Sequence, residues 1–242
     1  MPKKDITISS TLLYSRKIPI RIFLLYFFLL TGGLWHILGY FQSLMNSLAS
    51  PSLIGLGIWI ITESVIELEK NNFRQNERNG VKKFLLWSLA VIFGSIIIEG
   101  IGVNTELIFG QYAYGQNLPP YLSGVPLAIG FAWIGMILSS AAVAQRLFPK
   151  IYQSSFWATI LLTALFMTIF DLFMEPAVIK LGYWQWLNGT IPFQNYVAWF
   201  VISALFVAAG LKSKIFQVKL PTIAFHAYLA QLIYFIMIYF KS

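Results

Sequence analysis

Apolar stretches of bilayer-crossing length recur along the whole sequence, and they constrain the fold more than any other feature. A transmembrane helix needs roughly 20 consecutive, mainly apolar residues. Seven candidate spans lie at residues 19–40, 50–68, 84–103, 122–145, 154–175, 195–211 and 221–240. The composition agrees, because 11% of the residues are charged, whereas soluble domains carry about 25%. The sequence therefore predicts an all-α, polytopic integral membrane protein, with residues 1–242 forming a single transmembrane helical domain.

Basic residues gather in alternate connections between these spans. Lys and Arg favour the cytoplasmic ends of transmembrane helices. With the N-terminus inside, all but two of the 17 basic residues, Lys180 and Lys241, fall on the cytoplasmic side. Omitting the second span would place the basic cluster at 70–83 outside. We therefore expect seven spans with a cytoplasmic N-terminus in the cell inner (plasma) membrane, and we attribute the net charge of +8 to topology rather than to nucleic acid.

Six of the nine acidic residues lie in or beside the predicted spans. Ionisable groups inside a membrane are costly, usually face the bundle interior and often mark a functional site. The predicted topology sorts them into an inner pair near the cytoplasmic face, Glu63 and Glu67, and an outer cluster: Glu99, Glu106, Asp171 and Glu175, with His36 at similar depth.

Asp171 and Glu175 are four residues apart and so share one face of a helix. Pro176 is expected to end or kink that helix and to bias Glu175 away from helical geometry. Two neighbouring carboxylates in a low dielectric cannot both ionise cheaply, so one should hold a proton at neutral pH. That arrangement places a proton donor beside a base. The alternative is that these acids hydrogen-bond to Tyr, Trp or Asn side chains and only fix helix packing.

Two outer connections, at residues 100–126 and 182–199, are rich in aromatic residues, Gly and amides and nearly free of charge. For any single aromatic residue, the usual interfacial belt of Trp and Tyr is an adequate explanation. Together the two connections predict re-entrant segments that line a pocket for a long apolar ligand.

The sequence lacks the residues that several classes of membrane protein and enzyme require. The chain has no Cys and only two His, too few for the clusters of membrane iron hydroxylases. No Gly-x-Gly-x-x-Gly or P-loop spacing is present. The last span has no interior Lys for a retinal Schiff base, which excludes rhodopsin. We therefore expect neither a metal site nor a cofactor.

Two ordered blocks of residues resemble a known family. The first block reads Glu99-Gly-x-Gly102-Val-x-Thr105, then Phe109-Gly-x-Tyr-x-Tyr114, Gly124-Val-Pro126 and Trp133. The second reads Asp171-Leu-Phe-Met-Glu175-Pro176, then Gly182-x-Trp184-x-Trp186, Pro192-x-x-Asn195-Tyr and Trp199. Over about residues 99–199 this pattern resembles the carotenoid-biosynthesis membrane family of bisanhydrobacterioruberin hydratase and the γ-carotene 1′-hydratases. The chain departs from the family pattern at Thr105-Glu106, where the family has Thr-Gly, and at Glu175-Pro176, where it has Asp-Pro.

The resemblance implies a carotenoid hydratase that adds water across the terminal C1=C2 double bond of an acyclic carotenoid end group, without a cofactor. Asp171 and Glu99 would then form the acid–base pair, with Glu175 tuning their protonation. The substrate-binding residues would be Tyr112, Tyr114, Trp184, Trp186, Asn195, Thr105 and Trp133, with Asn195 holding the water. The substrate would be a carotenoid dissolved in the bilayer, and association with other carotenoid enzymes is left open.

Two other functions stay open at this point. One is another isoprenoid enzyme, above all a small membrane-type lycopene cyclase, which begins with the same protonation but in which an internal double bond captures the cation. A transporter or lipid-binding protein would use the buried acids as a proton relay. Transporters often show broken helices in corresponding halves, and no such internal symmetry is evident in the sequence.

Overall fold

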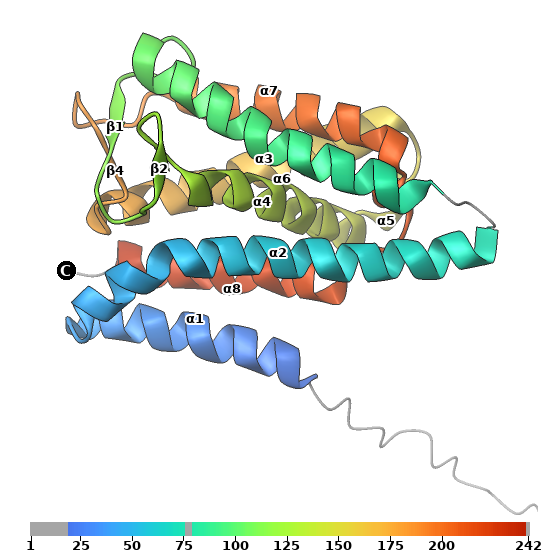
Figure 1. Cartoon of the computed structure of the whole chain (residues 1–242), viewed down its shortest axis with the longest axis horizontal. Helices are drawn as coiled ribbons and strands as arrows, with labels where there is room; N and C mark the ends of the chain where they lie inside the picture. The colour runs from blue at the N-terminus through green and yellow to red at the C-terminus, as the bar shows by residue number, and fades with distance from the viewer. Residues whose placement is uncertain (1–18, 76–78, 241–242) are drawn as a thin grey trace, which may run out of the picture.

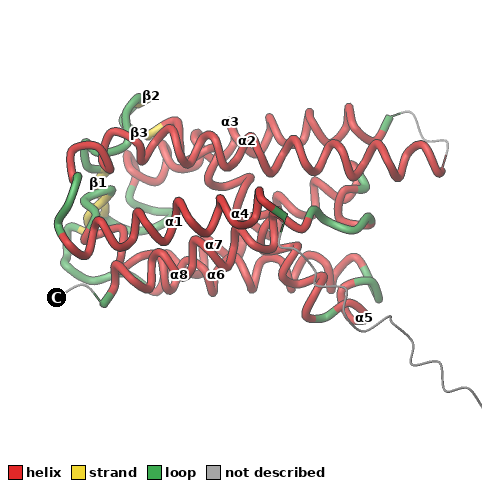
Figure 2. Tube along the Cα trace, turned by 90° about the horizontal axis from the view of Figure 1, so that it is seen from below, coloured by secondary structure: helices red, strands yellow, loops and turns green. Residues whose placement is uncertain are grey.

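The computed structural model describes residues 19–75 and 79–240, and these form a bundle of roughly parallel and antiparallel helices (Figures 1 and 2). Seven helices are long and apolar enough to cross a bilayer. They are α1 (Ile20–Leu38), α2 (Gln42–Gln75), α3 (Gly80–Thr105), α4 (Leu127–Leu147), α6 (Phe156–Lys180), α7 (Phe193–Gly210) and α8 (Thr222–Tyr239). Shorter helical elements are α5 (Pro149–Tyr152), η2 (Leu211–Ser213) and η3 (Ile215–Gln217). The prediction of an all-α, polytopic membrane protein is confirmed.

Helix α4 is the central helix of the bundle. It contacts α2, α3, α6 and α8, and 83% of its apolar window is buried. Small residues make this possible, because they let neighbouring backbones approach closely in a membrane. A Cβ atom on Gly130 would lie 2.7 Å from the carbonyl oxygen of Ile92 on α3. The sequence of α4 is therefore adapted to contact several helices at once.

Two of the helix boundaries that differ from the predicted ones bear on the buried acids or the strands. Helix α4 begins at Leu127 rather than at residue 122, because β2 (Tyr121–Leu122) and β3 (Val125–Pro126) pair as a hairpin just before it. Helix α6 does not end at Pro176 but continues to Lys180. Proline removes one helical hydrogen bond, yet Ala177 and Val178 are buried beyond it, and their packing holds the last turn. Glu175 therefore remains helical, on the same helix as Asp171.

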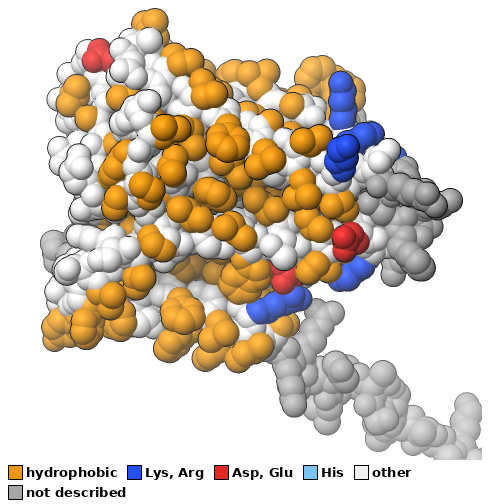
Figure 3. All heavy atoms as spheres, viewed as in Figure 1, with side chains coloured by type: hydrophobic (Ala, Val, Ile, Leu, Met, Phe, Trp, Pro, Cys, Tyr) orange, Lys and Arg blue, Asp and Glu red, His pale blue; other side chains and the backbone are white. Residues whose placement is uncertain are grey.

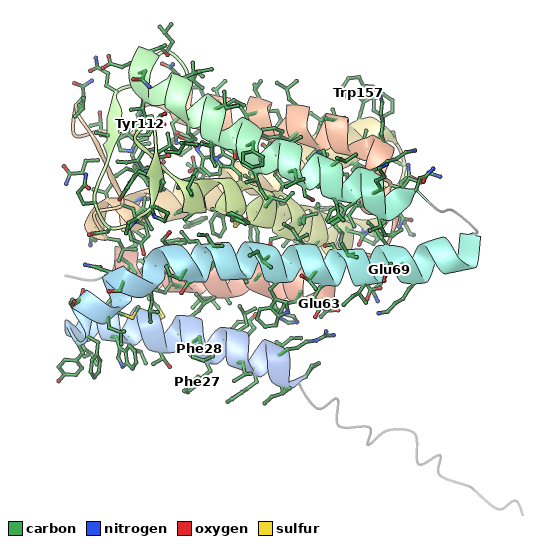
Figure 4. The ribbon with its side chains drawn as sticks, in the orientation of Figure 1. Phe27, Phe28, Glu63, Glu69, Tyr112 and Trp157 are labelled. Atoms are coloured by element: carbon green, nitrogen blue, oxygen red, sulfur yellow. The ribbon has the colours of Figure 1, made fainter. Side chains whose placement is uncertain are left out.

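The basic residues gather at one end of the bundle, opposite the strands (Figure 3). At this end Arg21 contacts Glu63 at 2.6 Å and Lys70 contacts Glu67 at 2.9 Å, so the predicted inner acids are paired with basic residues. Glu63 and Glu69 point out near this end, far from Tyr112 (Figure 4). Lys180 lies at the strand end, where its Nζ donates to the Tyr239 carbonyl oxygen at 2.8 Å. The cytoplasmic location of the N-terminus stays a prediction.

The two aromatic connections meet at the end opposite the basic residues. Strand β1 (Tyr112–Tyr114) pairs antiparallel with β4 (Trp184–Trp186), and the resulting ribbon crosses the ends of the helices (Figure 1). The prediction of re-entrant segments was wrong in form. In place of re-entrant segments, three residues of each connection pair across to the other, and the first connection also forms the β2–β3 hairpin within itself.

Candidate active site

The β1–β4 ribbon directs four aromatic side chains into the bundle. Tyr112 lies opposite Trp186, and Tyr114 lies opposite Trp184. Side chains alternate between the two faces of a strand, so all four point to one face, while Ala113 and Gln185 between them are exposed. The Tyr-x-Tyr and Trp-x-Trp spacings are therefore a strand pattern that delivers four N–H or O–H donors to the same buried region.

Two of these donors bind Glu99, which lies on α3 and is buried. The hydroxyls of Tyr112 and Tyr114 donate to Glu99 Oε2 at 2.5 and 2.9 Å. On the other side, the indole Nε1 of Trp133 on α4 donates to Oε1 at 3.0 Å. Glu99 thus accepts hydrogen bonds at both oxygens from three neutral side chains.

The other two donors bind Glu175. The indole groups of Trp184 and Trp186 donate to Glu175 Oε2 at 3.1 and 2.8 Å. Its Oε1 lies 3.3 Å from Nδ2 of Asn195, which also donates to Asp171 Oδ2 at 2.8 Å. One amide group on α7 therefore joins the two carboxyls of α6.

Asp171 differs from the other two acids in having one carboxyl oxygen without a hydrogen-bond partner among the described residues. It is fully buried, at 0% exposure, and the unpartnered oxygen is its Oδ1. A buried polar atom without a partner costs free energy and calls for an explanation. Among the six oxygens of these three carboxyls, Oδ1 of Asp171 is the one to which no described residue donates a hydrogen bond.

The three acids form one electrostatic unit. Glu99 interacts with both Asp171 and Glu175 through space, and the Tyr112 ring lies 5.4 Å from the Trp186 ring, between the two sets of hydrogen bonds. Burial and the nearby Glu99 carboxyl raise the pKa of the Tyr112 hydroxyl and that of Tyr114. Both phenols therefore stay protonated and remain donors at any physiological pH.

Three residues predicted at or near this cluster lie elsewhere. Thr105 is exposed at the end of α3, where its hydroxyl donates to the Ile101 carbonyl oxygen. Glu106 is exposed beyond the same end and accepts a hydrogen bond from Gln111. His36 contacts Gln42 and the ring of Tyr234. By contrast, the structure brings Glu99, Asp171, Glu175, Tyr112, Tyr114, Trp133, Trp184, Trp186 and Asn195 together.

Two residues beyond the predicted set belong to the cluster. The Trp199 ring on α7 stacks on the Trp133 ring, with centroids 4.4 Å apart. Tyr196 is half-buried beside Asn195 and interacts electrostatically with Asp171 and Glu175. The spacing Asn195-Tyr and Trp199 places them on neighbouring faces of one helix, but only the position of α7 shows which faces are turned toward the acids.

Within the described part of the chain, no three His, Cys, Asp or Glu side chains are grouped as metal ligands. Two hollows of the described structure lie away from the acids: one is between α2, α4 and α8, and the other is at the basic end.

The ribbon depends on one glycine at its closest approach. Gly115 donates its N–H to the Tyr183 carbonyl oxygen at 2.8 Å, and a Cβ atom on it would lie 2.1 Å from the carbonyl oxygen of Gly182. Gly115→Ala is therefore expected to separate β1 from β4 and to lower the free energy of unfolding by about 1–3 kcal/mol, the usual cost of overpacking. Thermal unfolding in detergent measures this effect.

The matched control is Gly55→Ala in α2, where an added Cβ meets no atom within 4 Å. Alanine favours a helix over glycine by up to about 1 kcal/mol, so this variant should unfold at or above the wild-type temperature. Equal stability of the two variants would contradict the structural role given to Gly115.

Fold and site together define a class: a multi-pass membrane protein that buries three carboxyl groups among neutral donors at one end of its bundle. Such a cluster, inside a low dielectric, is suited to holding and moving protons.

Comparison with known proteins gives the family. A model of the carotenoid biosynthesis protein family matches residues 52–241, and the chain belongs to this family. The match is wider than the predicted core at 99–199 and leaves only α1 and the beginning of α2 outside.

One relative is the bisanhydrobacterioruberin hydratase of Haloarcula japonica, which is 26% identical over 123 residues. These cover 49% of this chain and 42% of the relative, so the match spans less than half of that protein's length. No solved structure matches the chain. The family and this relative support a carotenoid-modifying membrane enzyme.

Proposed function

We propose that this protein is a carotenoid 1,2-hydratase of the plasma membrane, which adds water to the terminal C1=C2 double bond of an acyclic carotenoid end group. The observation that carries the proposal is the unpartnered Oδ1 of Asp171, buried in a cluster of three carboxyls. The family and the name of the relative supply the substrate class.

Asp171 is the proton donor in this proposal. Its Oδ1 carries the proton and gives it to C2, so that the π electrons of the double bond form the new C–H bond and leave a tertiary cation at C1. Three buried carboxyls that contact only neutral donors cannot all carry a charge cheaply, so a proton on this group is expected.

The hydrogen bonds favour Glu175 as the base rather than Glu99. Glu175 shares the Asn195 amide with Asp171 and so lies beside the proposed donor, whereas no described residue joins Glu99 to Asp171 by hydrogen bonds. Among the described residues no donor contacts Oδ1 of Asn195, which can therefore accept a hydrogen bond from water. That water adds to C1, Glu175 removes its extra proton, and return of the proton to Asp171 completes the cycle with one water added.

The surroundings suit a cationic intermediate. Aromatic faces attract a cation within about 6 Å, and the rings of Tyr112, Tyr114, Trp184 and Trp186 surround the acids. The negative charge of the Glu99 carboxylate would also stabilise the cation. Among the described residues no basic side chain pairs with Glu99.

The acids lie close to the apolar surface from which a substrate dissolved in the bilayer would enter. Asp171 on α6 is followed directly by the exposed Leu172 and Phe173, and Asn195 on α7 is followed by the half-buried Tyr196 and the exposed Val197. On both helices, exposed apolar side chains therefore directly follow the residues of the acid cluster. We propose that the carotenoid end group inserts between α6 and α7.

The proposal is tested by expressing the protein in a bacterium that accumulates lycopene or γ-carotene and analysing the pigments by chromatography and mass spectrometry. A more polar pigment heavier by one water molecule supports the hydratase. An isomer of unchanged mass would indicate a cyclase instead. Unchanged pigments, with the protein present in the membrane and with longer acyclic carotenoids also unaltered, would contradict the enzyme and favour a transporter or lipid-binding protein.

A further inference from the structure

A second site lies at the basic end of the bundle, far from the acids. A hollow of about 500 Å³ opens there between α3 and the end of α7. The side chains and backbone that line it are Lys83, Leu86, Trp87, Ala209, Lys212 and Ser213. The proposed hydratase chemistry does not use these residues.

The two lysines of this hollow have no partner of opposite charge. Lys83 is exposed in the first turn of α3, and Lys212 is exposed in η2, just after α7. Within the described ranges, neither Lys83 nor Lys212 makes an ion pair or a hydrogen bond. Two ammonium groups from different segments therefore face one hollow with their donors free.

The floor of the hollow is apolar and rigidly built. The Trp87 indole donates to the Phe206 carbonyl oxygen at 2.8 Å and contacts the Phe216 ring edge-on at 5.4 Å. A Cβ atom on Gly210 would lie 2.6 Å from the Trp87 ring, so Trp87 reaches the end of α7 only because residue 210 is glycine. The exposed Leu86 continues this apolar surface along α3.

We propose that this hollow binds an anionic membrane lipid, with its phosphate between Lys83 and Lys212 and an acyl chain along Leu86 and Trp87. Basic pockets between transmembrane helices at the ends of spans suit acidic headgroups, and lysines at helix ends lie at headgroup level. The apolar wall selects a lipid over a soluble phosphate, because a free anion gains nothing from contact with Leu86.

The full-length protein in detergent is titrated with dioleoyl phosphatidylglycerol or dioleoyl phosphatidylcholine, and bound lipid is counted by native mass spectrometry. We expect tighter binding of the phosphatidylglycerol, and a roughly tenfold to thirtyfold weaker affinity for it in the K83Q/K212Q variant, since each surface lysine contributes modestly to lipid attraction. The control is K150Q/K219Q, which removes the same charge at the same end outside the hollow and should bind as the wild type does.

Two results would overturn the proposal. An equal loss of affinity in K83Q/K212Q and K150Q/K219Q would show a diffuse charge effect and no site. Displacement of the lipid by soluble glycerol phosphate at similar concentrations would show a phosphate site that does not recognise the acyl chain. Pigment formation by K83Q/K212Q is measured in parallel, so that the outcome here is separate from that of the hydratase proposal.

Discussion

Replacing Asp171 with Asn is expected to abolish pigment hydration while the protein remains in the membrane. Asn keeps the size of the side chain and an oxygen that accepts from Asn195 at the position of Oδ2, but it has no acidic proton to donate at Oδ1. General acid–base groups contribute about 10²- to 10⁴-fold to rate, so the hydrated pigment should fall by at least about a hundredfold. The amount of hydrated pigment is measured by chromatography, in cells that contain equal amounts of the two proteins in the membrane.

Glu106→Gln is the control for this variant. Glu106 is an acid at the same end of the bundle, but it is exposed and bonded to Gln111 rather than to the cluster. Its replacement should leave pigment hydration near the wild-type level. Turnover retained by Asp171→Asn, or lost equally in Glu106→Gln, would exclude Asp171 as the proton donor.

Glu175→Gln is expected to reduce hydration by about a hundredfold and more than Glu99→Gln does. At position 175 the change removes the proposed base, and it places an amide N–H₂ group against Nδ2 of Asn195 or against the Trp184 and Trp186 indoles, all of which are donors. At position 99 the change keeps an acceptor for the two tyrosines, and the amide N–H₂ group then faces a single donor, the Trp133 indole.

The comparison of these two variants assigns the base. Both are measured as initial rates of pigment conversion, normalised to protein in the membrane, together with thermal unfolding to separate chemistry from stability. A larger loss in Glu99→Gln would return the assignment to the pair Asp171 and Glu99 that the resemblance implies, and would leave Glu175 as the residue that tunes it.

The carboxyl cluster shows how far sequence reasoning reaches. The depth of Glu99, Asp171 and Glu175 followed from the spans alone, because a charged group in an apolar run must turn toward the bundle interior. The spacing of Asp171 and Glu175 also placed them on one helix face, but the residue that links them did not follow. Asp171 and Glu175 share the Asn195 amide because α6 lies against α7, a packing choice that hydropathy does not encode.

Thr105 and Pro176 show where local patterns mislead. Thr105 is part of a motif, yet it ends its helix at the surface, because motif spacing does not report which side of the last turn faces the bundle. Pro176 is expected to end or kink α6; the helix does not end there, because tertiary burial of Ala177 and Val178 outweighs the lost hydrogen bond. The aromatic connections likewise look like loops, since their two strands pair only across 69 or more residues of intervening chain.

The sequence by itself determined the number of spans, the gathering of basic residues at one end and the depth of Glu99, Asp171 and Glu175, because burying apolar surface and avoiding charge in lipid act on each segment independently. Only the tertiary structure decided the β1–β4 ribbon, the division of donors between Glu99 and Glu175 and the unpartnered oxygen of Asp171. These depend on helix contacts and strand register, which bring together residues whose mutual positions no single segment specifies.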